Sequence, residues 1–116
     1  QMNIQELMTV VCNKIPVKVA ILNNGCLGMV RQWQELFYKK RYSHTKLCNP
    51  DFVKLAEAYG AAGMRVTKKE DVRKAIEKAI EIDNTVVLDF VVEEEENVYP
   101  MVPAGEAINR MIGGMA

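Results

Sequence analysis

Two asparagines and a glycine follow directly on an apolar run and are the feature of this chain best suited to chemistry. Residues 17–22 are β-branched and mostly apolar, and Asn23, Asn24 and Gly25 come immediately after them. Asparagine offers side-chain carbonyl oxygens, and glycine lets the backbone approach a ligand closely. Such hard oxygen ligands suit Mg²⁺, which keeps several waters and takes few protein ligands. The same residue types also form plain turns, so spacing alone leaves both interpretations open.

The reactive side chains elsewhere give weaker signals. The cysteines Cys12, Cys26 and Cys48 are odd in number and form no C-x-x-C pair, which argues against a disulfide framework and against a zinc site. A nucleophilic Cys26 would need a neighbouring base, and nothing in the sequence places His44, the single histidine, beside it. We therefore expect a reducing cytoplasmic setting and a surface position for His44.

Length and composition are those of an ordinary globular domain. The chain has 116 residues, of which 49% are hydrophobic, and its 15 basic residues balance 15 acidic ones. A formal net charge of zero removes the broad electrostatic case for binding nucleic acid or an anionic membrane. No apolar run approaches the roughly 18–20 residues of a membrane span. We therefore expect neither a nucleic acid nor a membrane as a partner.

The elements that would position these residues alternate between helix and strand. Apolar periodicity predicts helices over residues 4–13, 27–38, 52–59, 68–82 and 105–112. Apolar runs predict strands at 17–22, 62–66 and 85–92. This order predicts an α/β fold, a three-layer parallel sheet with helices on both faces and its most apolar strand, the last, at the centre. Because no strand precedes the first helix, we expect the fold to be truncated at its N-terminal side.

Local signals predict how three of these helices begin. Asn3 with Glu6, and Thr67 with Glu70, have the spacing of capping boxes. Asn49 stands before a proline and an aspartate and is the predicted cap of the third helix. The acidic run 93–96 is expected to form a solvated turn, because like charges repel one another when buried.

The helix predicted over 27–38 carries an apolar stripe that has two interpretations. Leu27, Val30, Trp33 and Phe37 recur at helical spacing, which is typical of a face packed into a core. A lone tryptophan in a soluble domain more often lies in a core or an interface than against a substrate. Core packing of Val30 and Trp33 therefore stands as an alternative to any binding role.

The chain resembles a known enzyme family. The stretch VKVAILNNGCLGMVRQWQ (17–34) closely resembles the catalytic subunit of acetohydroxyacid synthase, also called acetolactate synthase, a thiamine-diphosphate enzyme. Four further stretches resemble that family in the same order: QMNIQEL (1–7), FYKKRYSHT (37–45), NPDFVKLAEAYG (49–60) and VYPMVPAGEAINRMI (98–112). The resemblance implies that residues 1–116 are the C-terminal portion of a thiamine-diphosphate-binding domain.

The resemblance also implies roles for residues around the asparagine pair. Asn24 would give a side-chain oxygen, and Cys26 its backbone carbonyl, to the Mg²⁺ that holds the cofactor's diphosphate. Many relatives have His or Glu where this chain has Cys26, a difference that matters little for a backbone ligand. The positions implied to line the thiamine pocket are Leu27, Gly28 and Met29, and those implied to line the substrate pocket are Val30 and Trp33.

The family's reaction is implied as well. It decarboxylates pyruvate on thiamine diphosphate and condenses the two-carbon unit with a second 2-keto acid, in branched-chain amino acid biosynthesis. The full-length enzyme would carry FAD, form at least a homodimer and accept a regulatory subunit as a partner. The family's aspartate ligand would stand just before Gln1, and its activating glutamate would come from a partner subunit. We therefore expect the isolated fragment to be inactive.

Two other functions remain as alternatives. The chain can be a free-standing α/β interaction or regulatory domain, which would pair with itself through an unsatisfied sheet edge. It can also belong to another carboligase or decarboxylase that uses thiamine diphosphate.

Overall fold

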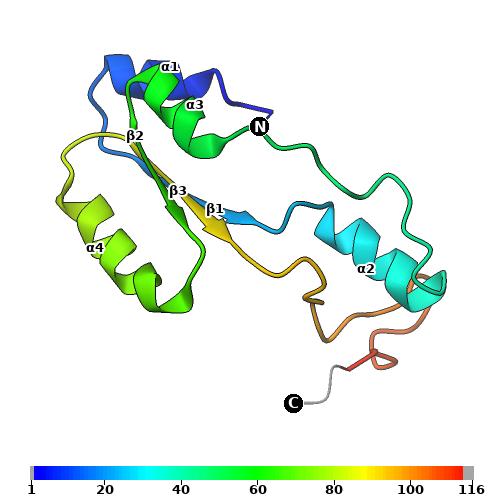
Figure 1. Ribbon diagram of the computed structural model, residues 1–116. Coiled ribbons are helices and arrows are strands. Elements are labelled where there is room, and N and C mark those ends of the chain that lie inside the picture. Colours follow the sequence, from blue (N-terminus) through cyan, green and yellow to red (C-terminus); the bar gives the residue numbers. More distant parts are fainter. Residues whose placement is uncertain (1, 114–116) are drawn as a thin grey trace. The chain divides into compact units, whose positions relative to one another are not determined.

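The structure, a computed structural model, describes residues 2–113 in two compact units. The first unit comprises residues 2–25 and 48–92, and the second comprises residues 26–47 and 93–113. The first contains a parallel sheet with its helices, and the second contains one helix and the last segment of the chain (Figure 1). Among the described residues, no helix has the length and apolar character that a membrane span requires.

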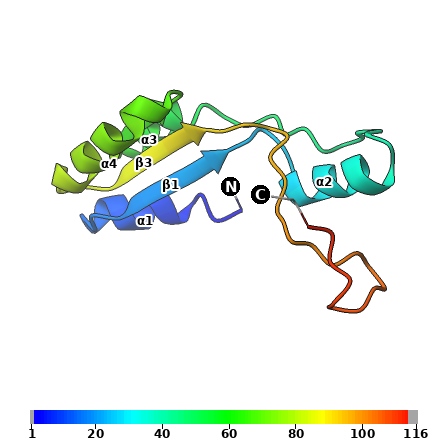
Figure 2. The same cartoon turned by 90° about the horizontal axis from the view of Figure 1, so that it is seen from below.

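Three parallel strands form the sheet of the first unit in the order β1-β3-β2. These are β1 (Lys18–Asn23), β2 (Ala62–Val66) and β3 (Val86–Val91), and Figure 2 shows β1 and β3 side by side and pointing the same way. The predicted parallel sheet with the last strand at its centre is confirmed. The apolar run 17–22 also favours a strand that is buried on both faces. This expectation is wrong, because β1 lies at an edge of the described sheet and Leu22 is 73% exposed.

Helices cover both faces of this sheet, as the three-layer prediction requires. On one face lie α1 (Glu6–Cys12) and α3 (Phe52–Tyr59), and on the other lies α4 (Val72–Glu81), which the short 3₁₀ turn η1 (Lys69–Asp71) precedes (Figure 1). Successive side chains of the central strand point to opposite faces and serve two cores. One core contains Val66, Ala79, Val86, Leu88 and Phe90, and the other contains Phe52, Ala56, Ala61 and Val87.

Helix α3 begins at Asp51 and ends at Gly60. The Asp51 carboxylate accepts hydrogen bonds from the backbone N–H groups of Val53 at 3.0 Å and Lys54 at 3.2 Å. Asp51, and not the predicted Asn49, is therefore the cap. Gly60 ends the helix in the left-handed region, at φ 84°.

The two predicted capping boxes are wrong. Helix α1 begins after Gln5 and α4 begins after Asp71, and neither helix has a side-chain hydrogen bond at its cap. Before α1 a tight turn, in which the N–H of Glu6 bonds to the carbonyl of Asn3 at 3.2 Å, occupies the cap position. Before α4 the 3₁₀ turn η1 moves the first α-helical residue away from Thr67.

The second unit contains helix α2 (Gly28–Phe37), but the helix predicted over 105–112 is wrong. This segment forms turns in the left-handed region at Gly105 (φ 85°), and an antiparallel bridge pairs Met101 with Ile112. Most helices of this length depend on packing of an apolar face, and in the turns observed here Ile108 is 77% exposed. The glycine pair 113–114 is the expected end of that helix, and Gly114 lies outside the described residues.

Candidate functional site

The asparagine pair lies where the parallel strands of the first unit end. Asn23 is the last residue of β1 and is in register with Val91, the last residue of β3. Its backbone carbonyl accepts the N–H of Val92 at 3.1 Å, which extends the pairing by one residue. In open α/β sheets, ligands bind outside the carboxyl ends of the strands. The loop therefore occupies the position expected of a ligand-binding segment.

Asn23 shapes this loop through three side-chain hydrogen bonds. Its Oδ1 accepts the backbone N–H of Gly25 at 3.2 Å and the Nδ2 group of Asn49 at 3.1 Å, and its own Nδ2 donates to Asp89 at 2.9 Å. The first of these bonds closes an Asx turn, and Gly25 follows it with φ 66°. Sequence reasoning assigned a ligand role to Asn24 and no separate role to Asn23. The Asn-x-Gly spacing was the signal for the turn.

A buried carboxylate on the central strand anchors Asn23. Asp89 is fully buried, and its second oxygen accepts a hydrogen bond from Nε of Arg65 at 2.9 Å. Arg65 also reaches Asp51 at 3.1 Å. The hydrogen bond to Asp89 raises the pKa of Arg65 above its ordinary value, and the backbone N–H of Lys54 lowers the pKa of Asp51. Sequence reasoning missed Asp89, although a lone acid in an apolar strand always requires partners.

The two residues with an implied metal role fall on either side of the boundary between the units. Asn24 is half-buried in the first unit, and Cys26 is a buried residue of the second unit. Cys26 pairs with Lys46 in an isolated bridge, and its thiol donates to the carbonyl of Glu94 at 3.8 Å. Burial raises the pKa of the Cys26 thiol, which argues against a nucleophilic role.

The donor chemistry of the loop fits Mg²⁺. An amide oxygen and a main-chain carbonyl are hard neutral ligands, and Mg²⁺ takes only a few of these beside phosphate oxygens and water. Apart from Gly25 itself and its two chain neighbours, no heavy atom lies within 4 Å of the position that a Cβ would take on Gly25, so the backbone there faces open space. The described residues contain no cluster of three or more His, Cys, Asp or Glu suited to a metal. The donor chemistry of the loop thus fits part of a Mg²⁺ ligand set.

Helix α2 buries polar residues and exposes its apolar stripe. Arg31 and Gln32 are each 1% exposed, whereas Val30 and Trp33 are 37% and 46% exposed. Core packing, the alternative interpretation of Val30 and Trp33, is therefore wrong for this structure. The other exposed apolar residues at the start and end of the helix are Leu27, Met29 and Phe37. Exposed apolar surface of this kind is typical of binding sites and interfaces.

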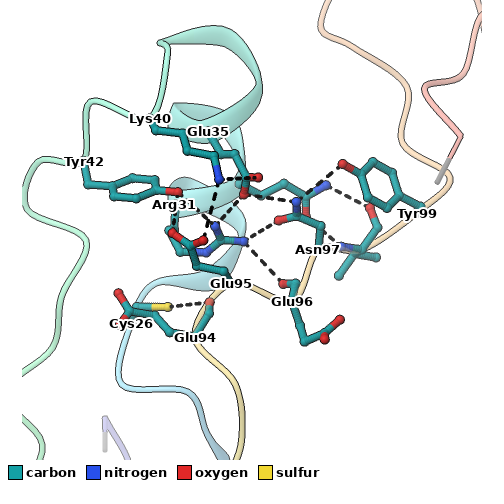
Figure 3. Close-up of polar contacts among 12 residues, drawn as sticks. Cys26, Arg31, Glu35, Lys40, Tyr42, Glu94, Glu95, Glu96, Asn97 and Tyr99 are labelled. Carbon is teal, nitrogen blue, oxygen red and sulfur yellow. Dashed lines mark hydrogen bonds and ion pairs between the residues drawn. The ribbon is translucent and has the colours of Figure 1, made fainter.

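Arg31 binds the segment that follows β3 (Figure 3). Its Nη1 donates to Glu35 at 2.6 Å, and its Nη2 donates to the side chain of Asn97 and to the carbonyl of Glu96. Asn97 also donates to Glu35 at 3.1 Å. The hydrogen bonds from Arg31 and Asn97 lower the pKa of Glu35. Burial works to lower the pKa of Arg31, but its hydrogen bond to Glu35 holds that pKa above the ordinary value.

Gln32 holds the same segment through one backbone residue. Its Oε1 accepts the N–H of Val98 at 2.8 Å, and its Nε2 donates to the carbonyl of Val98 at 2.9 Å. The side-chain amide thus satisfies both backbone groups of Val98, as a neighbouring strand would. Sequence reasoning gave no role to Arg31 or Gln32, because Asn97 and Val98, to which they bond, lie more than 60 residues away in the chain.

Charged groups at the surface complete this cluster. Lys40 lies 3.4 Å from Glu35 and 3.6 Å from Glu95, and the hydroxyl of Tyr42 donates to Glu95 at 2.9 Å (Figure 3). The acidic run 93–96 contains a turn with mostly exposed side chains, as predicted. His44 is exposed, also as predicted, and its nearest polar partner is the adjacent serine.

Curated proteins that resemble this chain include acetolactate synthases. The acetolactate synthase large subunit of Corynebacterium glutamicum is 55% identical, over 92% of this chain and 18% of its own length. The mitochondrial acetolactate synthase of Schizosaccharomyces pombe is 50% identical over 92% of this chain, and the isozyme 2 large subunit of Escherichia coli is 45% identical over 96%. They are covered over 16% and 20% of their lengths. The chain thus spans about a fifth of the length of these relatives.

Solved structures and a family match give the same picture of the fold. The thiamine diphosphate-dependent 4-hydroxybenzoylformate decarboxylase of Rhodococcus jostii RHA1 is 32% identical, with a TM-score of 0.68 over 80% of this chain and 18% of its own. The benzoylformate decarboxylase of Polynucleobacter necessarius is 25% identical, with a TM-score of 0.73 over 84% of this chain and 18% of its own. Residues 1–90 match the family described as thiamine pyrophosphate enzyme, C-terminal TPP binding domain. The chain therefore belongs to the C-terminal cofactor-binding domains of the thiamine pyrophosphate (thiamine diphosphate) enzymes.

Proposed function

We propose that residues 1–116 are the C-terminal portion of the thiamine-diphosphate-binding domain of an acetolactate synthase large subunit. The observation that carries this proposal is the 45–55% identity to proteins of that name over at least 92% of the chain. The family match favours an enzyme domain over a free-standing interaction domain.

The full-length protein would decarboxylate pyruvate and join the two-carbon unit to a second 2-keto acid, an early step of branched-chain amino acid biosynthesis. Thiamine diphosphate, when bound, supplies the nucleophilic carbon and the electron sink for this chemistry. The protein supplies binding, orientation and exclusion of water, and the residues of this chain contribute to the first two.

The loop after β1 would hold the Mg²⁺ that binding of the cofactor's diphosphate would require. Asn24 would give its side-chain oxygen and Cys26 its backbone carbonyl, and Gly25 alone separates them in the chain. The hydrogen bonds of Asn23 to Gly25 and Asp89 support this role, because they hold the turn on which Asn24 stands. A further carboxylate ligand would come from outside this chain.

The exposed face of α2 would contact organic parts of the ligands. Leu27, Gly28 and Met29 would line the thiamine pocket, and Val30 and Trp33 would line the substrate pocket. The exposure of Val30 and Trp33 supports this assignment, since both side chains are available for contact. Arg31 and Gln32 would act indirectly, by fixing the other side of the helix.

The wider setting follows from the same resemblance. The full-length enzyme would carry FAD in a part not represented here, form a homo-oligomer of at least two subunits and take a regulatory subunit as an optional partner. It would work in the cytoplasm without nucleic-acid or membrane partners. The isolated 116 residues would be inactive, because ligands from elsewhere in the protein are missing.

Product analysis of the full-length protein tests this proposal. Incubation with pyruvate, Mg²⁺ and thiamine diphosphate is expected to yield acetolactate, and a reaction without Mg²⁺ serves as the control. A second candidate, a decarboxylase that releases a free aldehyde, is favoured by the names of the structural neighbours. Release of acetaldehyde or benzaldehyde from the matching 2-keto acid, with no acetolactate formed, would establish that candidate instead.

A further inference from the structure

We propose that Asp89 is a positioning residue for the cofactor loop. It selects one orientation of the Asn23 side chain and thereby holds the turn that presents Asn24 to the cation. This inference rests on the proposed function, because it concerns the binding of Mg²⁺ and thiamine diphosphate by that loop.

The position of Asp89 suits an anchor. It is fully buried on β3, the central strand, whereas Asn23 ends β1 at the edge of the described sheet. Each carboxylate oxygen has its own donor, Nδ2 of Asn23 at 2.9 Å and Nε of Arg65 at 2.9 Å. A carboxylate in such surroundings is costly unless its oxygens are hydrogen-bonded. Its presence therefore requires donors at these two places.

The orientation of the Asn23 amide follows from what its neighbours can do. The backbone N–H of Gly25 can only donate, so the Asn23 atom that faces it must be the oxygen. The amide nitrogen must then face Asp89, which as a carboxylate can only accept. If the Asn23 amide turned over, its Nδ2 group would face the N–H of Gly25, and its Oδ1 would face a carboxylate oxygen of Asp89. Gly25 and Asp89 thus jointly exclude the second orientation.

The anchor is itself held in place. Arg65 donates to Asp89 and also reaches Asp51, the cap of helix α3. Asn49 donates to the same oxygen of Asn23 that accepts from Gly25. The loop is thus tied to the central strand and, through Arg65, to the start of a helix.

The variant Asp89→Asn tests the contact with almost no change of shape. An amide offers one acceptor where two donors converge, so either Asn23 or Arg65 must lose its hydrogen bond. The double variant Asn23→Asp with Asp89→Asn restores every bond. The carboxylate at position 23 accepts from the N–H of Gly25 and from the side-chain amide at position 89, and the oxygen of that amide accepts from Arg65. Asn23→Asp alone sets two carboxylates against each other.

Two measurements on the full-length protein report the effect. The first is millisecond hydrogen exchange at the Gly25 amide without cofactor, and the second is the Mg²⁺ concentration that half-saturates binding of thiamine diphosphate. In Asp89→Asn we expect the hydrogen-exchange rate of the Gly25 amide to rise about 10-fold and the half-saturating Mg²⁺ concentration to rise at least 5-fold. In the double variant we expect both values to return to within 2-fold of wild type. Leu88→Ala is the matched control, since that buried neighbour packs on the opposite face of β3 and is expected to lower stability without moving either value.

Each result decides the inference. Three results would overturn it. The first is a Gly25 exchange rate and a half-saturating Mg²⁺ concentration within 2-fold of wild type in Asp89→Asn. The others are equal changes of both values in Leu88→Ala, or no recovery of them in the double variant. If Asp89→Asn does not fold, Asn23→Asp tests the same contact from the loop side, with the same expected changes and the same recovery. If the wild-type protein shows no Mg²⁺-dependent binding of the cofactor, the proposed function fails and this inference fails with it. The binding measurement reports that failure, whereas the hydrogen-exchange rates alone would not.

Discussion

Replacing Arg31 by alanine is expected to release residues 94–98 from the polar side of helix α2. The buried guanidinium donates to Glu35, Asn97 and the carbonyl of Glu96. Removal of one partner from a buried ion pair costs about 3–5 kcal/mol. Glu35 retains some exposure and keeps Lys40 at 3.4 Å as a second partner. We therefore expect the lower end of that range, about 3 kcal/mol.

Hydrogen exchange of the full-length protein measures this loss where it occurs. The N–H of Val98 bonds to Gln32, next to Arg31, and reports opening of the segment. A loss of about 3 kcal/mol corresponds to exchange roughly 150-fold faster at this amide. Arg73→Ala is the matched control. Arg73 also pairs with a glutamate four residues on, at 3.8 Å, but its side chain is 87% exposed, so about 0.5 kcal/mol or less is expected.

The comparison of the two arginines gives a clear refutation. Exchange at Val98 within 3-fold of wild type in Arg31→Ala would show that the buried cation does not hold the segment. An equal effect of Arg31→Ala and Arg73→Ala on global stability, with no local change at Val98, would refute the reasoning in the same way.

Three further predictions concern other contacts. Gly63→Ala brings a Cβ to 2.8 Å from the carbonyl oxygen of Val53 and should cost about 1–3 kcal/mol in thermal melts, so an unchanged melting temperature would be inconsistent with this packing. Gln32→Glu sets an oxygen against the carbonyl of Val98 and should cost about 2 kcal/mol at that amide, and unaltered exchange there would exclude the contact. The folded-state pKa of Glu35 lies below its unfolded value of about 4.3, so its stabilisation is present above that pH and lost as the pH falls through the folded value. The free energy of unfolding, measured with urea from pH 6 to 3, should therefore decline less steeply with falling pH in Glu35→Gln than in the wild type. Identical slopes for the two proteins would contradict this.

The strands were predictable because a run of apolar residues both favours a strand and needs to be buried. The run 85–92 is almost wholly apolar, and such a run is stable only where both faces are covered, as they are for β3. The run 17–22 looks similar, but its burial depends on which strands flank it, and that is a property of the whole sheet. Local sequence therefore predicted the strand and not its place at an edge.

Helix ends and the last segment were harder because competing local structures differ by little free energy. A 3₁₀ turn before α4 and a tight turn before α1 take the place of the predicted capping boxes. Residues 105–112 have helical spacing, yet a helix this short depends on packing of its apolar face, which spacing alone does not supply.

The periodicity of α2 predicted the helix correctly and left its buried side undecided. Which side is buried depends on the segment 94–98, which lies far away in the sequence and offers polar groups to Arg31 and Gln32. The resemblance put Val30 and Trp33 in a substrate pocket, and that role stays a prediction. Of the loop residues, Asn24 was singled out and Asn23 was not, because a role that depends on a distant Asp89 leaves no local pattern.

The most direct test of the cofactor assignment is calorimetric titration of thiamine diphosphate into the full-length protein, with and without Mg²⁺. We expect binding that requires Mg²⁺ in the wild type and is weakened at least about 10-fold in Asn24→Ala. Binding that does not depend on Mg²⁺, or an Asn24→Ala variant with wild-type affinity, would contradict the assignment of this loop as the cofactor's metal site.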